Sequence, residues 1–212
     1  MKKYAIREVF GTLQGEGAQA GTPAVFLRFA GCNLGYEVCP WCDTDWVKAR
    51  HTLPLSETLD LVRVRAHEAF GGEREGMLLV ATGGEPSLQL DEALSAGLRK
   101  RGYRIAMESN GSRPIDRSLV DWLTISPKQS RYVQKEGDEL KIVYSGGAAP
   151  GPAEDTEAVL KLAEGTRFDH HFLQPLDLPE TGPNYEETVA AVMRLGPPWR
   201  VSVQTHKVLE IP

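Results

Sequence analysis

The sequence is poor in cysteine and has no long apolar run. Only 3 of its 212 residues are cysteines, and no segment approaches the run of about 18 apolar residues that marks a membrane-spanning helix. The first ten residues, MKKYAIREVF, lack the apolar stretch of a signal peptide. These absences argue against a membrane span and against a framework of several disulfides, and they predict a cytoplasmic protein.

Excess positive charge, internal repeats and low-complexity tracts are also lacking. Asp and Glu outnumber Lys and Arg by 29 to 24, which gives a net charge of -5. Without a local basic patch, such a chain has no general attraction to the phosphates of nucleic acids. An apolar content of 41% over 212 residues is sufficient for one substantial core. We therefore expect a single domain over residues 1–212, with neither a nucleic-acid nor a membrane partner.

All three cysteines lie in one short stretch. Cys32, Cys39 and Cys42 fall within GCNLGYEVCPWCDT, residues 31–44. Three thiols cannot all pair as disulfides, but thiolates are soft ligands for a metal or an iron-sulfur cluster. Structural zinc usually takes four protein ligands, and the nearest histidine, His51, lies nine residues after Cys42. A cubane cluster held by only three cysteines would instead leave one iron open, as a catalytic site requires.

Apolar segments alternate with helical patterns along the chain. The expected strands cover residues 5–10, 24–30, 77–81, 104–107, 122–125, 139–144, 171–173 and 201–203. The expected helices cover 56–70 with Ser56 as N-cap, the stretch between Asp91 and Gly102, 154–163 and 185–195. This alternation is typical of a parallel α/β fold. Six repeats are too few for a closed eight-stranded barrel, so we expect a partial parallel β/α barrel of about six strands, or an open doubly wound sheet.

Arg28 interrupts the apolar strand expected at 24–30. A buried guanidinium is costly unless it is paired, so a carboxylate of the fold or of a ligand should lie beside it. The strand follows a glycine-dense turn at 11–21, where the absence of side chains permits close backbone approach.

Polar or glycine-rich junctions follow four of the expected strands. They are Thr82–Pro86, Glu108–Gly111, Ser126–Lys128 and Gln174–Asp177. Each alone is explained by turn chemistry. Because ligands collect at the carboxyl ends of parallel strands, their shared position beside the cysteine stretch predicts one common site.

Several segments together resemble a known family. The three cysteines, Trp41 directly before Cys42, and a GGEP sequence after a later strand resemble the radical S-adenosylmethionine superfamily. More narrowly, FGTLQGEG, RFAGCNL, CDT, TGGEP, ESNG, SPK, QPLD and the terminal QTHKVLEIP resemble, in this order from Phe10 to Pro212, the 7-carboxy-7-deazaguanine synthases. The superfamily usually has three residues between its first two cysteines, whereas six separate Cys32 from Cys39 here. The narrower family varies in this gap, and a loop of six still closes at little entropic cost.

The resemblance implies a reaction and its cofactors. Radical-mediated ring contraction would convert 6-carboxy-5,6,7,8-tetrahydropterin into 7-carboxy-7-deazaguanine with loss of ammonia, as a carbon-nitrogen lyase in queuosine or another 7-deazapurine pathway. The cofactor radical would abstract the hydrogen, so no side chain is assigned as catalytic. Cys32, Cys39 and Cys42 would hold a [4Fe-4S] cluster, and Thr44 would bind Mg2+, which prefers oxygen ligands.

The resemblance also assigns binding residues. S-adenosylmethionine would contact Trp41, Gly84, Ser126, Pro127, Lys128, Gln174, Pro175, Leu176 and Asp177, with Glu108 and Asn110 as further candidates for its ribose. The pterin substrate would contact Leu13, Gln14, Gly15, Arg28, Thr82 and the terminal carboxylate of Pro212. The family-like ending has Gly where this chain has Glu210. A flavodoxin-like or other reductant and a homodimer are implied as partners.

Other interpretations remain open at this stage. An activase that makes glycyl radicals on a partner protein would use the same cysteines without needing Gln14 or Arg28. A zinc-binding interaction module would recruit a fourth ligand such as His51, and a simple electron carrier would not need the polar junctions. Glu16 and Glu85 are expected to be functional by position, although Glu85 would equally serve to satisfy backbone amides. No catalytic role is assigned to His170, His171, His206 or Lys207.

Overall fold

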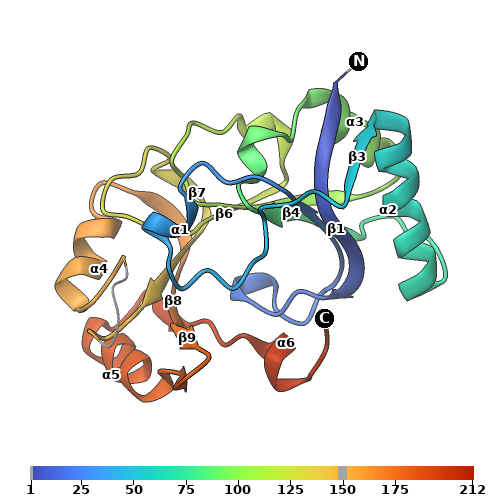
Figure 1. The fold of residues 1–212 in the computed structure, drawn as a ribbon. Helices are drawn as coiled ribbons and strands as arrows, with labels where there is room; N and C mark the ends of the chain where they lie inside the picture. The colour runs from blue at the N-terminus through green and yellow to red at the C-terminus, as the bar shows by residue number, and fades with distance from the viewer. Residues whose placement is uncertain (1, 148–151) are drawn as a thin grey trace.

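The computed structural model describes residues 2–147 and 152–212, and one nine-stranded sheet dominates it (Figure 1). The strands of this sheet are β1 (Lys3–Leu13), β2 (Pro23–Phe29), β3 (His51–Pro54), β4 (Leu78–Gly83), β5 (Arg104–Ser109), β6 (Trp122–Ile125), β7 (Glu136–Tyr144), β8 (Arg167–Pro175) and β11 (Trp199–Val201). Their order is β11-β8-β7-β6-β5-β4-β2-β1-β3. From β2 to β11 all neighbours pair in parallel, whereas β1 pairs antiparallel with both β2 and β3. A short ribbon of β9 (Asp177–Leu178) and β10 (Gly182–Pro183) stands apart.

The longer helices cover one face of the sheet. They are α2 (Leu55–Phe70), α3 (Glu92–Lys100), α4 (Thr156–Ala163) and α5 (Tyr185–Leu195), and α1 (Gly35–Val38) and α6 (Thr205–Val208) are single turns. Val62, Leu94, Leu98, Val159, Leu162 and Ala191 from the longer helices all join the main apolar core. Between residues 2 and 147 and between 152 and 212, no helix is both long and apolar enough to cross a membrane.

Alternation of side chains along the strands separates this core from a second face. In β2, Val25, Leu27 and Phe29 belong to the main core, while Ala24 and Phe26 belong to a smaller apolar cluster on the opposite, inner face. The period of two then places Arg28 on the inner face as well. The same rule places Thr82 of β4 and Glu108 of β5 there. In β2, β4 and β5 the inner face therefore changes from apolar to polar toward the carboxyl ends of the strands.

The predicted fold class is confirmed. The sheet is mostly parallel and does not close into a barrel. The six predicted parallel strands correspond to β2, β4, β5, β6, β7 and β8. A seventh parallel strand, β11, spans Trp199–Val201 and so begins before the predicted segment at 201–203. Strand β3 was not predicted, because its four residues carry no alternation of their own and are ordered by pairing with β1.

Local signals were correct at one helix start and wrong at another. The Asp91 side chain accepts a hydrogen bond from the Leu94 N–H at 3.0 Å, which confirms it as the cap of α3. Ser56 is not the cap of α2, since the helix begins at Leu55 with extended Pro54 in the N-cap position. Pro54 is also the last residue of β3, so strand pairing sets this start. Residues 145–155, SGGAAPGPAED, whose Gly/Pro/Ala-rich composition indicates a connection, lie partly outside the described residues.

Candidate functional site

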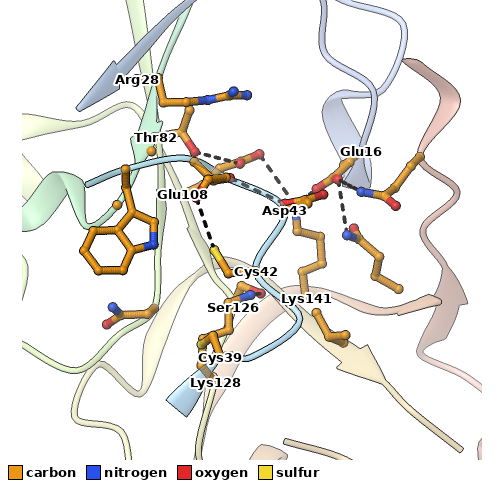
Figure 2. Close-up of a pocket in the computed structure, with 18 of the residues that line it drawn as sticks. Glu16, Arg28, Cys39, Cys42, Asp43, Thr82, Glu108, Ser126, Lys128 and Lys141 are labelled. Carbon is orange, nitrogen blue, oxygen red and sulfur yellow. Dashed lines mark hydrogen bonds and ion pairs between the residues drawn. The ribbon is translucent and has the colours of Figure 1, made fainter. Parts of the chain in front are cut away.

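A cavity of about 260 Å³ lies at the carboxyl ends of the parallel strands (Figure 2). Of the residues to which the sequence assigns a binding role, all except Pro127 line it. They are Leu13, Gln14, Gly15, Arg28, Cys32, Cys39, Trp41, Cys42, Thr44, Thr82, Gly84, Ser126, Lys128, Gln174, Pro175, Leu176, Asp177 and Pro212, together with the further candidates Glu108 and Asn110. The common site predicted from the polar junctions is therefore present as one cavity, whereas the role of each residue in it stays a prediction.

Four polar side chains of the inner face form one wall of the cavity, and we call them the polar row: Arg28, Thr82, Glu108 and Lys141. Arg28 and Thr82 are register partners across β2 and β4. The Thr82 hydroxyl donates to one oxygen of Glu108 at 3.3 Å, and the Gln14 amide donates to the other at 3.0 Å. Neighbouring strands thus present their side chains at one level of the cavity.

Arg28 has the carboxylate partner that its position demands. Its guanidinium lies 2.6 Å from Glu8, across the β1–β2 pair, and 5.3 Å from the centre of the Phe10 ring. The partner belongs to the fold, which is one of the two predicted alternatives. Both side chains remain about a third exposed, at 29% and 30%. Because a guanidinium carries five N–H donors, Arg28 retains donors for a ligand in the cavity.

Lys141 is the most buried charge of the polar row, with a side chain that is 5% exposed. It forms an ion pair with Glu16 and lies 3.6 Å from Glu108. Burial by itself lowers the pKa of Lys141, but the carboxylates of Glu108, Glu16 and Glu139 outweigh it and raise the pKa above its ordinary value. Sequence reasoning missed this residue. The signal was the alternation in β7, where Glu139 and Lys141 alternate with the core residues Leu140 and Ile142.

Glu16 connects three segments that are distant in the sequence. Besides its ion pair with Lys141, it accepts hydrogen bonds from Gln204 at 2.8 Å and Gln174 at 3.2 Å. Burial raises the pKa of Glu16, but the ammonium of Lys141, the Gln204 amide and the nearby His206 prevail and hold the pKa at about 2. The loop after β1, the end of β8 and the C-terminal segment therefore meet at one ionised carboxylate.

The cysteine stretch, residues 31–44, forms the opposite wall. Its six-residue gap is occupied by the single-turn helix α1, and the Cys42 N–H donates to the Cys39 carbonyl at 3.0 Å. All three cysteines are free thiols that line the cavity. Burial raises the pKa of Cys39 to about 11, and proximity to Cys42 and Cys32 acts in the same direction against the opposing Lys128. Among residues 2–147 and 152–212, no three His, Cys, Asp or Glu side chains converge on one ion.

Two residues of the GGEP segment hold this wall against the sheet. A Cβ atom at Gly84 would lie 2.0 Å from the Gly31 carbonyl oxygen, so only glycine lets the cysteine stretch pass so closely. Glu85 is fully buried and accepts from the Ser87 N–H at 3.0 Å, the Ser109 hydroxyl at 2.8 Å and the Asn110 N–H at 2.9 Å. Of the two predicted roles of Glu85, the satisfaction of backbone amides is therefore the one observed.

The C-terminal segment lies beneath the loop that follows β1 (Figure 1), and its residues Gln204, His206 and Pro212 line the cavity. The backbone and hydroxyl of Thr205 donate to the Gly15 carbonyl at 2.9 and 3.0 Å. The His206 ring occupies the space above Gly15, where a Cβ atom would lie 2.1 Å from Nδ1. Lys207 reaches Asp177 at 2.7 Å and Asp43 of the cysteine stretch at 3.5 Å. The segment therefore contacts the loop after β1, the residues that follow β8 and the cysteine stretch.

The turn that follows α6 directs Pro212 into the cavity. The Ile211 N–H donates to the His206 carbonyl at 3.1 Å and the Glu210 N–H to the Lys207 carbonyl at 3.4 Å. This is the hydrogen-bond pattern of a Schellman motif, whose left-handed position is usually glycine. Glu210 occupies that position with a φ of 54°. The residue that departs from the family-like ending is thus the one whose backbone conformation favours glycine.

The histidines to which the sequence assigns no catalytic role fall into two groups. The His170 ring stacks on Trp122 with centroids 5.5 Å apart, and His171 packs edge-on against Trp199 at 5.2 Å. Neither lines the cavity. His206 does line it, so it is a site residue that sequence reasoning passed over, because only the docking of the C-terminal segment brings it there.

Comparison with known proteins gives the chain its family. No family model matches it. The chain is 41% identical to the 7-carboxy-7-deazaguanine synthase of Caulobacter vibrioides over 99% of both proteins. It is 42% identical to that of Bradyrhizobium diazoefficiens over 98% of this chain and 99% of the relative. The crystal structure of QueE from Escherichia coli matches with a TM-score of 0.67 and 25% identity, covering 95% of this chain and 93% of that one. The chain therefore belongs to the 7-carboxy-7-deazaguanine synthase family.

Proposed function

We propose that this protein converts 6-carboxy-5,6,7,8-tetrahydropterin into 7-carboxy-7-deazaguanine with loss of ammonia, as a carbon-nitrogen lyase of queuosine or related 7-deazapurine biosynthesis. The observation that carries the proposal is the convergence of the cysteines, Arg28 and the chain terminus Pro212 on one cavity. Near-complete coverage of relatives with this name supports it. We propose that residues 1–212 act as one domain.

The cysteine wall fits the cofactors of the proposal. Three free thiols on one side of the cavity offer soft ligands, and a cubane takes one thiolate per iron, so its ligands need not converge on a point. When bound, the [4Fe-4S] cluster and S-adenosylmethionine would supply the radical that abstracts the substrate hydrogen. Thr44, whose hydroxyl lies 3.4 Å from Asp43, would offer hard oxygen to Mg2+.

Lys128 and the end of β8 would hold S-adenosylmethionine. The Lys128 ammonium donates to the Ser126 hydroxyl at 2.8 Å and lines the cavity, where it would pair with the carboxylate of the methionine portion. Trp41, Gly84, Gln174, Pro175, Leu176 and Asp177 would complete the contacts. Pro127 does not line the cavity. Its ring, which fixes the φ angle, would set the backbone conformation between Ser126 and Lys128.

The polar row would bind the pterin. The free donors of Arg28 suit the carboxylate at C6 in a charge-assisted contact. Gln14 and Thr82 lie beside Glu108 and would face the edge of the heterocycle together with Leu13 and Gly15. The carboxylate of Pro212 would accept from the guanidine-like end of the pterin. By docking on Gly15, the C-terminal segment would exclude water from the reacting atoms.

The resemblance also supports proposals about partners. A flavodoxin-like or other reductant would deliver the electron, a homodimer would be the working assembly, and the cytoplasm would be the compartment. The glycyl-radical activase is disfavoured because Gln14, Arg28 and Pro212 share the cavity, which that activity does not require.

Anaerobic purification followed by reaction tests the proposal. We expect a coloured protein that contains iron and that forms 7-carboxy-7-deazaguanine, detected by mass spectrometry, from the carboxylated tetrahydropterin, S-adenosylmethionine and a reductant. A colourless protein that contains zinc would overturn the cofactor assignment. Cleavage of S-adenosylmethionine without the deazapurine product would overturn the substrate assignment and leave a different radical enzyme.

A further inference from the structure

A lysine with almost no exposed surface lies at the bottom of the cavity, surrounded by three carboxylates. Residue Lys141 is 4% exposed and Glu139 is 2% exposed. Removing an ammonium and carboxylates from water is costly, and well-packed apolar residues are often at least as stabilising as a buried ion pair. The inner face of strands β2 and β4 carries the apolar residues Phe26 and Val80, so the burial of Lys141 with Glu139 on the same face calls for a functional explanation.

The three carboxylates around Lys141 differ in the hydrogen bonds and ion pairs that their oxygens already form within the fold. Glu139 accepts from the Ala18 N–H at 2.8 Å, and its carboxylate fills the space beside Gly17. Glu16 forms the direct ion pair with Lys141 and accepts from two glutamine amides. Glu108 is held more loosely, at 3.6 Å from Lys141.

Glu108 is the member of the trio that lies in the polar row. Figure 2 shows it between Thr82 and the pair of Glu16 with Lys141. Its oxygens accept one hydrogen bond each, from Gln14 and Thr82. A carboxylate has about four lone-pair sites, so Glu108 retains acceptor capacity toward the cavity that it lines.

We propose that Lys141 is a positioning residue for the substrate: from one buried point it holds Glu16, which fixes the loop carrying Gln14, and keeps Glu108 aimed as an acceptor at the N–H groups of the pterin. This inference rests on the proposed function. Among the described residues, the ion pairs of Lys141 are those with Glu16 and Glu108. This inference assigns Glu108 to the pterin in place of the ribose of S-adenosylmethionine, so the effect of Lys141 falls on the pterin half of the cavity.

A binding measurement separates this role from a purely structural one. The protein is loaded with cluster and S-adenosylmethionine, and the dissociation constant of 6-carboxypterin, an oxidised and unreactive probe, is measured anaerobically by fluorescence. Loss of a hydrogen bond to a charged group predicts that Lys141→Met raises this constant about 10- to 100-fold. The dissociation constant of S-adenosylmethionine should change less than about 3-fold. Lys141→Arg keeps the charge and should recover most of the pterin affinity.

A matched control and a second variant keep the test decisive. Lys161 is 72% exposed and pairs with Glu157 on α4, so Lys161→Met should leave both constants unchanged. If Lys141→Met cannot be obtained folded, Glu108→Gln retains Lys141 and should weaken 6-carboxypterin binding by a similar factor.

Each remaining outcome overturns the inference. Equal weakening of both ligands in Lys141→Met, with a lowered melting temperature, would leave Lys141 a structural role only. Unchanged pterin binding in Lys141→Met or in Glu108→Gln would remove the positioning role. If the wild-type protein itself neither binds 6-carboxypterin nor forms the deazapurine, the proposed function fails and the inference fails with it, whereas normal wild-type binding confines a failure to Lys141.

Discussion

The two walls of the cavity are built in opposite ways. The cysteine stretch has one helical turn as its regular structure, and main-chain bonds such as Gly31 N–H to Trp46 and Glu85 N–H to Gly31, at 2.8 and 2.9 Å, anchor its start. The polar row projects from β2, β4, β5 and β7, whose backbones are fixed by parallel ladders. The first wall can absorb a six-residue gap between cysteines, while a shift of one residue in any strand would turn a polar-row side chain into the core.

The two walls also differ in what their side chains contact in the fold. Among the described residues, the cysteine thiols have almost no polar partners, since only the Cys42 sulfur approaches an oxygen there, the Thr44 carbonyl at 3.7 Å. The members of the polar row bind one another and their neighbours. Substitutions in the cysteine stretch should therefore affect cofactor binding and activity alone. Substitutions in the polar row should affect both activity and the free energy of unfolding.

Removal of one cysteine should have the largest effect on activity and the smallest on the fold. In Cys42→Ala the cluster would lose one of three ligands, so we expect the iron content to fall and product formation to become undetectable. The unfolding free energy of the metal-free protein should stay within about 0.5 kcal/mol of wild type. Denaturant unfolding and an iron assay measure the two effects, and a large loss of stability without loss of iron would reverse the assigned roles of the walls.

A change in the polar row should act on one substrate group. Arg28→Ala would remove a charge-assisted contact to the pterin carboxylate, so we expect the KM to rise by about 10- to 100-fold. It also breaks the 2.6 Å pair with Glu8. Binding of 6-carboxypterin should weaken far more than binding of a pterin without the carboxylate. Equal weakening of both ligands would show that Arg28 supports the wall without contacting that group.

The C-terminal segment contacts the cysteine stretch through Asp43 and the loop after β1 through Gly15, so its end should be sensitive to extension. Extra residues after Pro212 would remove its free carboxylate and displace it from the cavity, and we expect the KM to rise by about 10-fold. An N-terminal tag of equal length is the control, because Lys2 near that end has a side chain that is 50% exposed. Steady-state kinetics compare the two forms, and equal rates would argue against a role for the terminal carboxylate.

How much of the site could be predicted differs between the walls for a physical reason. The cysteine stretch is contiguous, so Cys32, Cys39 and Cys42 could be grouped from their nearness in the sequence, and the resemblance of several segments to a known family then implied their role as cluster ligands. The polar row is assembled by pairing in the sheet, and Arg28 was found because a charge interrupts an apolar run. Lys141 lies in a strand that also contains Glu139, so its charge stood out less, and only the sheet shows that both face inward.

The fold, like the site, could be predicted where the signal is local and not where it depends on a distant partner. Strands buried on both faces are continuous apolar runs, as in β4, and these were found, whereas β3 depends on its partner β1. The approach of α6 to Gly15 joins residues 190 positions apart. No local pattern encodes such a contact, which explains why His206 and the Gln204–Glu16 bond were not predicted.

Acid titration should show that the ion pair between Glu16 and Lys141, a member of the polar row, stabilises the fold. The pKa of Glu16 is about 2 in the folded protein, against an ordinary value of 4.5. A depressed carboxyl pKa adds stability above the unfolded value, and this stability is lost as the pH falls toward the folded value. The advantage of wild type over Glu16→Gln in unfolding free energy should therefore shrink by on the order of 2 kcal/mol between pH about 5 and pH about 2. Urea unfolding of both proteins at several pH values measures this difference in unfolding free energy. A difference that does not change with pH would mean that Lys141 does not lower the pKa of Glu16.

The smallest expected effect concerns Glu210, at the turn that precedes Pro212. Its φ of 54° is strained for a residue with a Cβ atom, so Glu210→Gly should stabilise the docked segment by up to about 1 kcal/mol. The Ile211 N–H, which donates to the His206 carbonyl at 3.1 Å, should then exchange with solvent up to about 5-fold more slowly. Glu210→Ala is the matched control, because it removes the carboxylate but keeps the Cβ atom. Equal slowing in both variants would assign the gain to charge, and faster exchange in Glu210→Gly would show that the left-handed turn does not order the tail.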